Sequence, residues 1–207
     1  AAYDITPSLN APGTPPQLIG LLNAPIGGYW PEIWGGNGKL LVVFPARAAR
    51  FMVADVTDPT NMFVVADRTL PNGDPSYAQF QDNFVFMDRY KIDMTNDFAI
   101  DLALDNRTRG IDPSQFALPI GNLLVTGGLQ RNGSTPMTQG LAIWAHQAAP
   151  DTTGPSVGFH IPRANQTSYP VGAPITLLIH ETLRTETIEN GTTFQVRPPS
   201  PSGTPGA

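Results

Sequence analysis

The chain has 207 residues, with 22 prolines, 20 glycines and no cysteine. Glycine and proline together make about a fifth of the chain, against about 12% in average proteins. Only 14% of the residues are charged and 41% are hydrophobic, which excludes a coiled coil and a highly charged disordered chain. The glycines show no period of three, which excludes collagen, and the lack of cysteine excludes a disulfide-stapled miniprotein.

Charge and hydropathy limit the partners. The formal net charge is -5, and the 12 lysines and arginines are scattered singly along the chain. Because nucleic-acid binding needs a basic stripe, we expect no nucleic-acid partner. No apolar run approaches the roughly 18 residues of a membrane span, so we expect no segment of this chain to cross a membrane.

Short apolar runs alternate with turn residues along the whole chain, and helical periodicity is nearly absent. This pattern predicts an all-β protein. Pairs such as Asn37-Gly38 and Asn72-Gly73 tolerate the positive φ angles of tight turns. The predicted strands are 17–22, 39–44, 51–56, 62–68, 77–80, 83–88, 90–94, 98–104, 122–126, 141–146, 157–161, 175–180 and 193–197.

The first two thirds of the chain contain a repeat. Three segments share a turn followed by an apolar strand: 36–44, 81–88 and 120–127. Aligned on Asn37, Asn83 and Asn122, they recur after 46 and then 39 residues. A unit of about 40–45 residues with four strands has the size of a propeller blade. The alternative is an ordinary β-sandwich whose strands are alike in composition.

One motif sharpens the repeat. Residues 51–61 read Phe-Met-Val-Ala-Asp-Val-Thr-Asp-Pro-Thr-Asn, and this stretch resembles the LVIVD repeat of bacterial extracellular propellers. The resemblance covers residues 17–146, with 1–16 as a linker or the end of a preceding region. Residues 90–94 and 141–144 occupy the motif's position in the next two units, but neither is followed by Asp-Pro. The resemblance implies partial β-propeller-like repeats.

The composition changes at 147–154, which reads as a second linker. From Asp151, the segment Asp-Thr-Thr-Gly-Pro-Ser-Val and the later residues up to 197 resemble the N-terminal half of an SbsA-type bacterial Ig-like domain. We therefore expect a partial Ig-like β-sandwich over 155–197, in which Ile175, Leu177 and Ile179 form one buried face.

An Ig-like domain usually needs about 90–100 residues. We therefore expect that the chain is a fragment of a longer multidomain protein and that 198–207 is a Pro/Gly/Ser linker or a truncated end. The two resemblances imply an exported bacterial protein, extracellular or on the cell surface.

Catalytic motifs are not evident in the sequence. There is no Gly-x-Ser-x-Gly elbow, and His180-Glu181 begins a zinc-protease motif that fails because residue 184 is arginine. His146, His160 and His180 are interpreted as strand-end or surface residues rather than metal ligands. We expect no cofactor, with Ca²⁺ as the one candidate considered below.

The densest acidic stretch runs from Asp82 to Asp105. Carboxylates that meet at the turns of β-hairpins can hold Ca²⁺ or supply an acid/base pair. Asp82, Asp88 and Asp93 are the candidate calcium ligands, and Lys91 between them is a candidate ligand-binding residue. The alternative is a set of solvent-facing acids at strand ends with local ion pairs.

A glycine-flanked aromatic cluster spans residues 27–36. Tyr29, Trp30 and Trp34, with the carboxylate of Glu32, are candidate ligand-binding residues, because exposed aromatic side chains can stack on sugar rings or anchor a protein partner. The alternative is packing of these side chains between repeat units.

These observations favour a non-catalytic binding or scaffolding segment of a modular surface protein, with a protein or a glycan at the cell surface as its partner. One alternative is part of a propeller enzyme, a hydrolase or oxidoreductase, whose catalytic residues lie outside this chain. Another is a structural spacer of a stalk or surface layer. Fold alone does not decide between them.

Overall fold

In the residues that it describes, the computed structural model contains small antiparallel β-sheets and one five-residue helix, α1 (Thr6–Asn10). The all-β prediction is therefore confirmed. Within the residues described, no helix is long and apolar enough to cross a membrane. The structure describes residues 1–4, 6–23, 30–46, 48–71, 75, 77–103, 116–130, 138–150, 152, 154–167, 169 and 172–181. The predicted strand 193–197 lies outside these residues.

Three sheets form the body of the molecule, and in each one consecutive strands pair as a meander. The first sheet consists of β3 (Glu32–Gly36), β4 (Lys39–Ala46), β5 (Arg50–Asp55) and β6 (Phe63–Thr69). The second consists of β7 (Ala78–Gln81), β8 (Phe84–Met87), β9 (Tyr90–Asp93) and β10 (Ala99–Ala103). The third consists of β11 (Phe116–Ile120), β12 (Leu123–Gln130) and β13 (Thr138–Ala145).

Two-residue turns join the first and second strands of these sheets, and they define the repeat. The turns are Asn37-Gly38, Asp82-Asn83 and Gly121-Asn122. Their first residues all have positive φ, at 52°, 52° and 58°. Asn37 therefore corresponds to Asp82 and Gly121. In the alignment on the three asparagines, Asn83 and Asn122 do correspond, but Asn37 is shifted by one residue. A one-residue shift reverses the face that each side chain occupies.

The remaining strands form two hairpins. β1 (Ala2–Asp4) pairs with β2 (Gln17–Gly20), and β14 (Val157–Ile161) pairs with β15 (Thr176–Ile179). Residues 1–16, expected as a linker or the end of a preceding region, contain a strand and the short helix. Gly20 lies against the loop after β5, since a Cβ on it would fall 1.8 Å from the carbonyl oxygen of Pro59.

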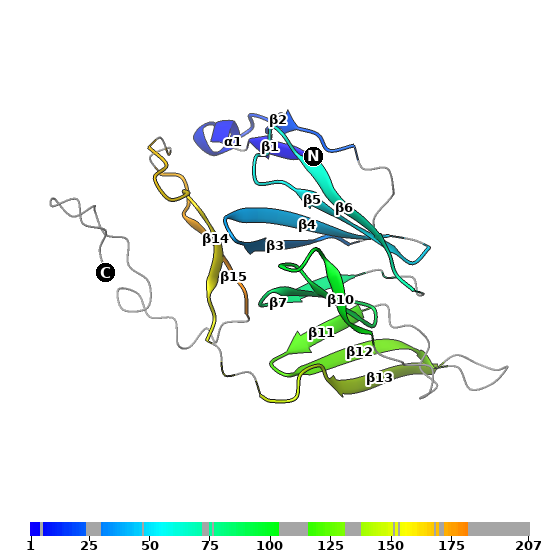
Figure 1. Ribbon diagram of the computed structural model, residues 1–207. Helices are drawn as coiled ribbons and strands as arrows, with labels where there is room; N and C mark the ends of the chain where they lie inside the picture. The colour runs from blue at the N-terminus through cyan, green and yellow to red at the C-terminus, as the bar shows by residue number, and fades with distance from the viewer. Residues whose placement is uncertain are drawn as a thin grey trace.

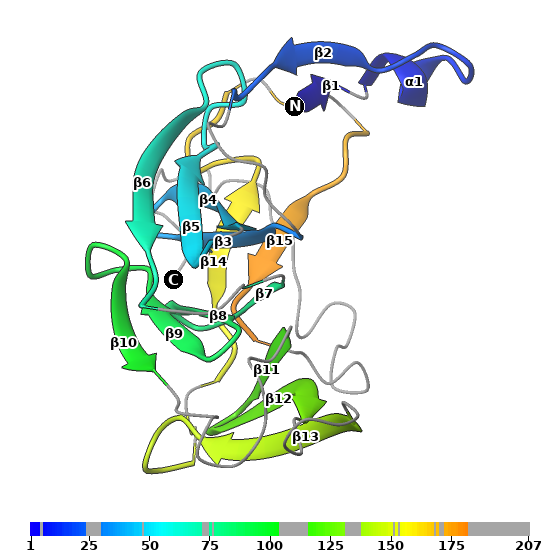
Figure 2. The same ribbon diagram turned by 90° about the vertical axis from the view of Figure 1, so that its right-hand side faces the viewer.

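The three sheets stack face to face in chain order (Figure 1). Their first strands are neighbours, because β7 contacts both β3 and β11. The outer strands β6 and β10 lie along one side of the stack, while β7 and β11 lie toward its middle (Figure 2). The three meanders thus stack on one another and meet at their first strands.

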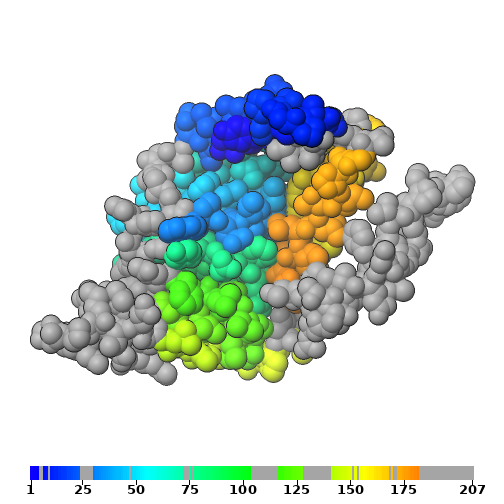
Figure 3. All heavy atoms as spheres, turned by 180° about the vertical axis from the view of Figure 1, so that it is seen from behind, coloured from blue at the N-terminus to red at the C-terminus, as the bar shows by residue number. Residues whose placement is uncertain are grey.

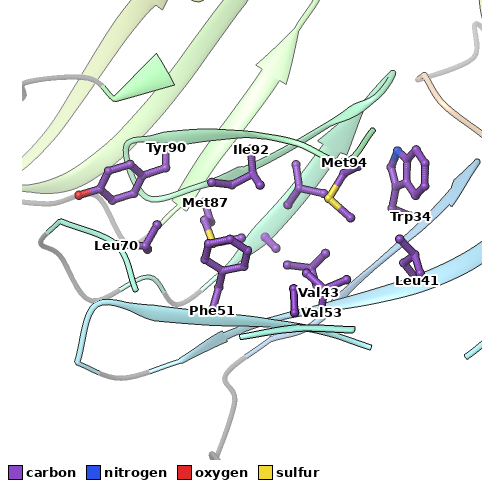
Figure 4. Close-up of a cluster of buried hydrophobic side chains, with 13 residues drawn as sticks. Trp34, Leu41, Val43, Phe51, Val53, Leu70, Met87, Tyr90, Ile92 and Met94 are labelled. Atoms are coloured by element: carbon purple, nitrogen blue, oxygen red, sulfur yellow. The ribbon is translucent and has the colours of Figure 1, made fainter. Parts of the chain in front are cut away.

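Apolar side chains fill both spaces between the sheets. Phe51 and Val53 of β5 meet Met87 and Ile92 of the second sheet in one cluster (Figure 4). Val85 of β8 belongs to the same cluster, whereas its neighbour Phe86 packs on Ala117 and Leu124 of the third sheet. Because side chains alternate along a strand, β8 contributes to both interfaces.

A hydrogen bond of the same kind crosses each interface near the first strands. The Trp34 indole Nε1 donates to the carbonyl oxygen of Asp82 at 2.9 Å. Gln81 Nε2 donates to the carbonyl oxygen of Gly121 at 2.8 Å. In both cases the acceptor is the first turn residue of the next sheet, held at positive φ. The first strand of one sheet therefore positions the turn of the following sheet.

The β14–β15 hairpin lies along the first sheet and the second (Figure 3). A Cβ on Gly35 of β3 would fall 2.6 Å from Phe159 Cβ and 2.7 Å from Leu178 Cδ2, so only glycine permits this approach. His180 Nε2 hydrogen-bonds to the Gly35 carbonyl oxygen, and the backbone N–H of Asp82 donates to the His180 carbonyl at 3.0 Å.

The face of β15 that packs on β3 differs from the prediction. Leu178 makes the contact with β3, whereas Ile175 is exposed and Leu177 and Ile179 are only half-buried. Because Leu178 has the opposite parity to these three residues, the predicted buried face is wrong in its phase. Arg163, after β14, adds a polar contact by donating from Nη2 to the Thr57 carbonyl oxygen.

The first interface predicts a clear contrast between two phenylalanines. Phe51 is fully buried between the sheets and Phe63 is half-exposed on β6. We expect Phe51→Ala to lower the free energy of unfolding by about 3–5 kcal/mol and Phe63→Ala by less than about 1 kcal/mol. Urea titration of both variants measures this difference. Equal losses would mean that the interface of the first and second sheets is not the core of the protein.

Candidate functional site

An exposed aromatic pair lies where the first two sheets meet. Trp30 lies two residues before β3, Tyr77 lies one residue before β7, and the two form a parallel β-bridge with one another. Their rings are stacked, with centroids 4.6 Å apart and planes inclined by 15°. Trp30 is 58% exposed although the pair is fixed by backbone from both sheets. The indole therefore presents a large apolar surface to solvent in a defined position.

A carboxylate and an amide lie next to this pair. Glu32 is two residues beyond Trp30, and Gln79 is two residues beyond Tyr77. Gln79 Nε2 lies 3.5 Å from Glu32 Oε2, and the backbone N–H of Ile33 donates to Glu32 Oε1 at 3.2 Å. Partial burial raises the pKa of Glu32 above its ordinary value of 4.5, and the hydrogen bond from Ile33 opposes that shift. The neutral acid is thus favoured more than in water.

The residues of the predicted aromatic cluster differ in exposure according to their position along the chain. Glu32 and Trp34 share one side of β3, and Trp30, two residues before Glu32, faces the second sheet as they do. Exposure falls inward along that side, from Trp30 to the half-buried Glu32 and then to Trp34, which is 2% exposed. Trp34 stacks on His180 with centroids 5.9 Å apart and belongs to the core, so it does not face a ligand. Tyr29 lies outside the described residues.

Lys91 is a buried residue on the side of the second sheet that faces the third sheet. Its Nζ lies 3.8 Å above the centre of the Phe84 ring and 3.0 Å from Asp101 Oδ2. The side chain is only 7% exposed. A cation held by an aromatic face and a carboxylate stabilises the contact between β9, β8 and β10. Lys91 is therefore placed for packing, and the structure does not present it to a ligand.

The three candidate calcium ligands do not converge. Asp82 lies in the turn between β7 and β8, and Asp93 pairs with Phe84 at the same end of the sheet. Asp88 lies in the turn between β8 and β9, at the opposite end, fully buried and with its Oδ2 3.7 Å from Arg89 Nε. The predicted three-carboxylate site is therefore not formed. In the described ranges no group of three or more His, Cys, Asp or Glu is placed to hold a metal ion.

Asp93 has a structural role that it shares with Asp55. Asp93 Oδ1 accepts hydrogen bonds from the backbone N–H and the hydroxyl of Thr95, both at 2.8 Å. Asp55 Oδ1 accepts from the backbone N–H of Thr57 at 2.9 Å. Each aspartate ends the third strand of its sheet and closes a turn two residues on. The shared aspartate of the repeat therefore terminates strands.

The pKa shifts of the two aspartates in the loop after β5 fit the structural role of Asp55. Burial by itself would raise the pKa of Asp55, but the hydrogen bonds from Thr57 and the ammonium group of Lys39 lower it overall. The side chain and backbone of Thr60 likewise lower the pKa of the exposed Asp58 in the same loop. Both carboxylates are held ionised to support the turn.

The histidines are bound to backbone. His146, directly after β13, has Nε2 2.8 Å from the Gly121 carbonyl oxygen, and its ring meets Phe86 edge-on. His180, directly after β15, bonds to Gly35 as described above. His160 lies within β14 with Nδ1 2.5 Å from the Pro162 carbonyl oxygen. The interpretation as strand-end or surface residues thus fits all three, since His146 and His180 follow strand ends and His160 is exposed on β14.

Two members of the site were missed in the sequence. Tyr77 and Gln79 were predicted to lie on a strand but were given no role. No local pattern marks them, because Tyr77 and Gln79 reach Trp30 and Glu32 only through the packing of the second sheet on the first.

The raised pKa of Glu32 predicts how stability changes with pH. The folded protein holds the Glu32 proton more tightly than the unfolded chain does, so protonation of Glu32 stabilises the fold. This stabilisation is fully present below about pH 4 and is lost as the pH rises through the raised pKa. Glu32→Gln should therefore be more stable than the native protein at neutral pH and equal to it near pH 4. Urea midpoints at both pH values test this; a difference that does not change with pH would contradict it.

Comparison of the sequence with protein-family models and with curated proteins, and of the structure with solved structures, finds no match. The resemblances to LVIVD repeats and to an SbsA-type Ig-like domain therefore rest on the residues quoted for them. Function must be argued from the geometry of the site itself.

Proposed function

We propose that this chain is a non-catalytic binding module whose ligand is a glycan, held on the Trp30–Tyr77 pair. The observation that supports the proposal is the stacking of a largely exposed indole on a second ring fixed by the neighbouring sheet. Tryptophan is highly buried on average and is enriched among the residues that dominate binding. A flat aromatic surface suits the C–H face of a sugar ring.

Polar groups beside the pair match the hydroxyl groups of a sugar. Glu32 offers two acceptor oxygens, and the Gln79 amide offers both a donor and an acceptor. Their mutual contact at 3.5 Å is long for a hydrogen bond, so a ligand hydroxyl can replace it at low cost. Because the partly desolvated carboxylate opposes added negative charge, a neutral glycan fits better than an acidic one.

The position of the pair favours binding with little reorganisation. Trp30 and Tyr77 are fixed by a backbone bridge between strands that start in two different sheets. A side chain held in this way loses little conformational entropy when a ligand arrives.

We further propose that the three meanders are propeller-type repeats and that the β14–β15 hairpin belongs to an Ig-like segment. The neighbouring first strands and the shared turn geometry support the first part. In a propeller, the first strands surround the central channel, which is where ligands commonly bind. The setting that we propose is an exported bacterial surface protein, which the two resemblances imply.

Glycan binding is tested with an array and with affinity electrophoresis in soluble polysaccharides. We expect the native protein to bind a neutral glycan, Trp30→Ala to lose at least tenfold in affinity, and Tyr77→Ala to weaken binding because the indole loses its support. Tyr3→Ala is the matched control, since Tyr3 is 57% exposed and lies on β1 outside the site. It should bind as the native protein does.

Two outcomes would contradict the proposal. One is a native protein that binds no glycan in either assay. The other is a glycan that binds equally well to the native protein and to Trp30→Ala.

A further inference from the structure

The outer face of the third sheet is apolar over the side chains that the structure describes. Side chains of β11, β12 and β13 alternate between this face and the interface with the second sheet. On the inner side, Ala117 and Leu124 are fully buried and Trp144 Nε1 donates to Thr126 Oγ1 at 3.1 Å. The large side chains of the outer face are between 38% and 64% exposed, and they are Phe116, Leu118, Ile120, Leu123, Leu141 and Ile143.

The repeat identifies this face as one that packs against another sheet. Leu41, Phe86 and Val125 occupy the same place, the third residue of the second strand after each turn. Leu41 packs against the second sheet and Phe86 against the third. Val125 continues the series onto the outer face, and no described element lies beyond it (Figure 1). The face thus continues an established kind of interface.

The outer face lacks the polar link used at the two internal interfaces. Trp34 and Gln81 each donate a hydrogen bond to the turn of the next sheet. By strand register, the corresponding residues of β11 are Leu118 and Ile120, which have no side-chain donor. The face therefore suits a purely apolar partner better than another repeat with the same turn.

The edge of the third sheet is also open among the described strands. In the first two sheets the third strand is flanked by a fourth, β6 or β10, whereas β13 is the last described strand of its sheet. β13 spans eight residues and contains neither a charged residue nor a proline. Charged residues and prolines are what usually protects an edge strand from pairing with another chain.

We infer that a second copy of this chain covers the outer face of the third sheet, packing its own third sheet against it about a two-fold axis. An uncharged face of large aliphatic side chains is complementary to itself, which is what a two-fold interface requires. Two such faces would together bury on the order of 1,000 Å², near the lower limit for a specific interface. The dimer should therefore be weak and depend on protein concentration.

The inference goes beyond glycan binding and does not depend on it. A dimer would display two Trp30–Tyr77 sites, so it would bind a polymeric glycan with higher avidity than one chain.

Sedimentation velocity over a wide concentration range, without any glycan, tests the dimer. Leu141→Lys places a charge on the face, and Leu21→Lys is its matched control, since the two leucines are 64% and 62% exposed and Leu21 lies outside the three sheets. We expect a monomer–dimer equilibrium for the native protein. Leu141→Lys should weaken it by at least tenfold, and Leu21→Lys should leave it unchanged.

Ile143→Lys serves the same purpose if Leu141→Lys does not fold, as judged by circular dichroism. A native protein that stays monomeric over the whole range would overturn the inference. It would also be overturned if Leu21→Lys weakened association as much as the variants of the third sheet do. Oligomers that grow beyond the dimer as concentration rises would also overturn the inference, because a two-fold interface closes at two copies.

Discussion

The second sheet is packed on both of its faces, and the rest of the structure depends on this. Val85 and Met87 of β8 face the first sheet, whereas Phe84 and Phe86 face the third. Each fully buried side chain of this size contributes about 1.5–3 kcal/mol, and the short second sheet brings such side chains to two interfaces at once. The first strands are held beside one another as a result, and this contact brings Trp30 to Tyr77.

The sequence was sufficient to predict the all-β class and the central strands of the sheets, because period-two alternation and turn pairs are local signals. β4, β5, β8 and β9 lie where they were predicted within a few residues. β3 and β11 were not among the predicted strands. Gly35 and Gly36 in β3 and Pro119 in β11 are residues that strands usually avoid. Close approach of the hairpin explains Gly35, a tertiary effect that no local pattern reveals.

The candidate site was predicted in part. Trp30 and Glu32 could be recognised by residue type, because aromatic side chains beside a carboxylate are unusual in a turn-rich segment. Whether a tryptophan faces solvent or the core depends on how far along β3 it lies, and this required the position of the second sheet. The separation of the three candidate calcium ligands has a related reason. Asp82 and Asp88 are six residues apart in the sequence, but the intervening strand β8 carries them to opposite ends of the sheet.

The hairpin that covers β3 has a consequence for how the protein is made. Gly35 and His180, joined by a hydrogen bond, are 145 residues apart in the chain. On the ribosome β3 is synthesised long before β14 and β15, so its Gly35 surface stays uncovered until this hairpin emerges. Contacts of such long sequence separation form late and slowly. The sheet of β3 is therefore translated early but completed only after β15 has been made.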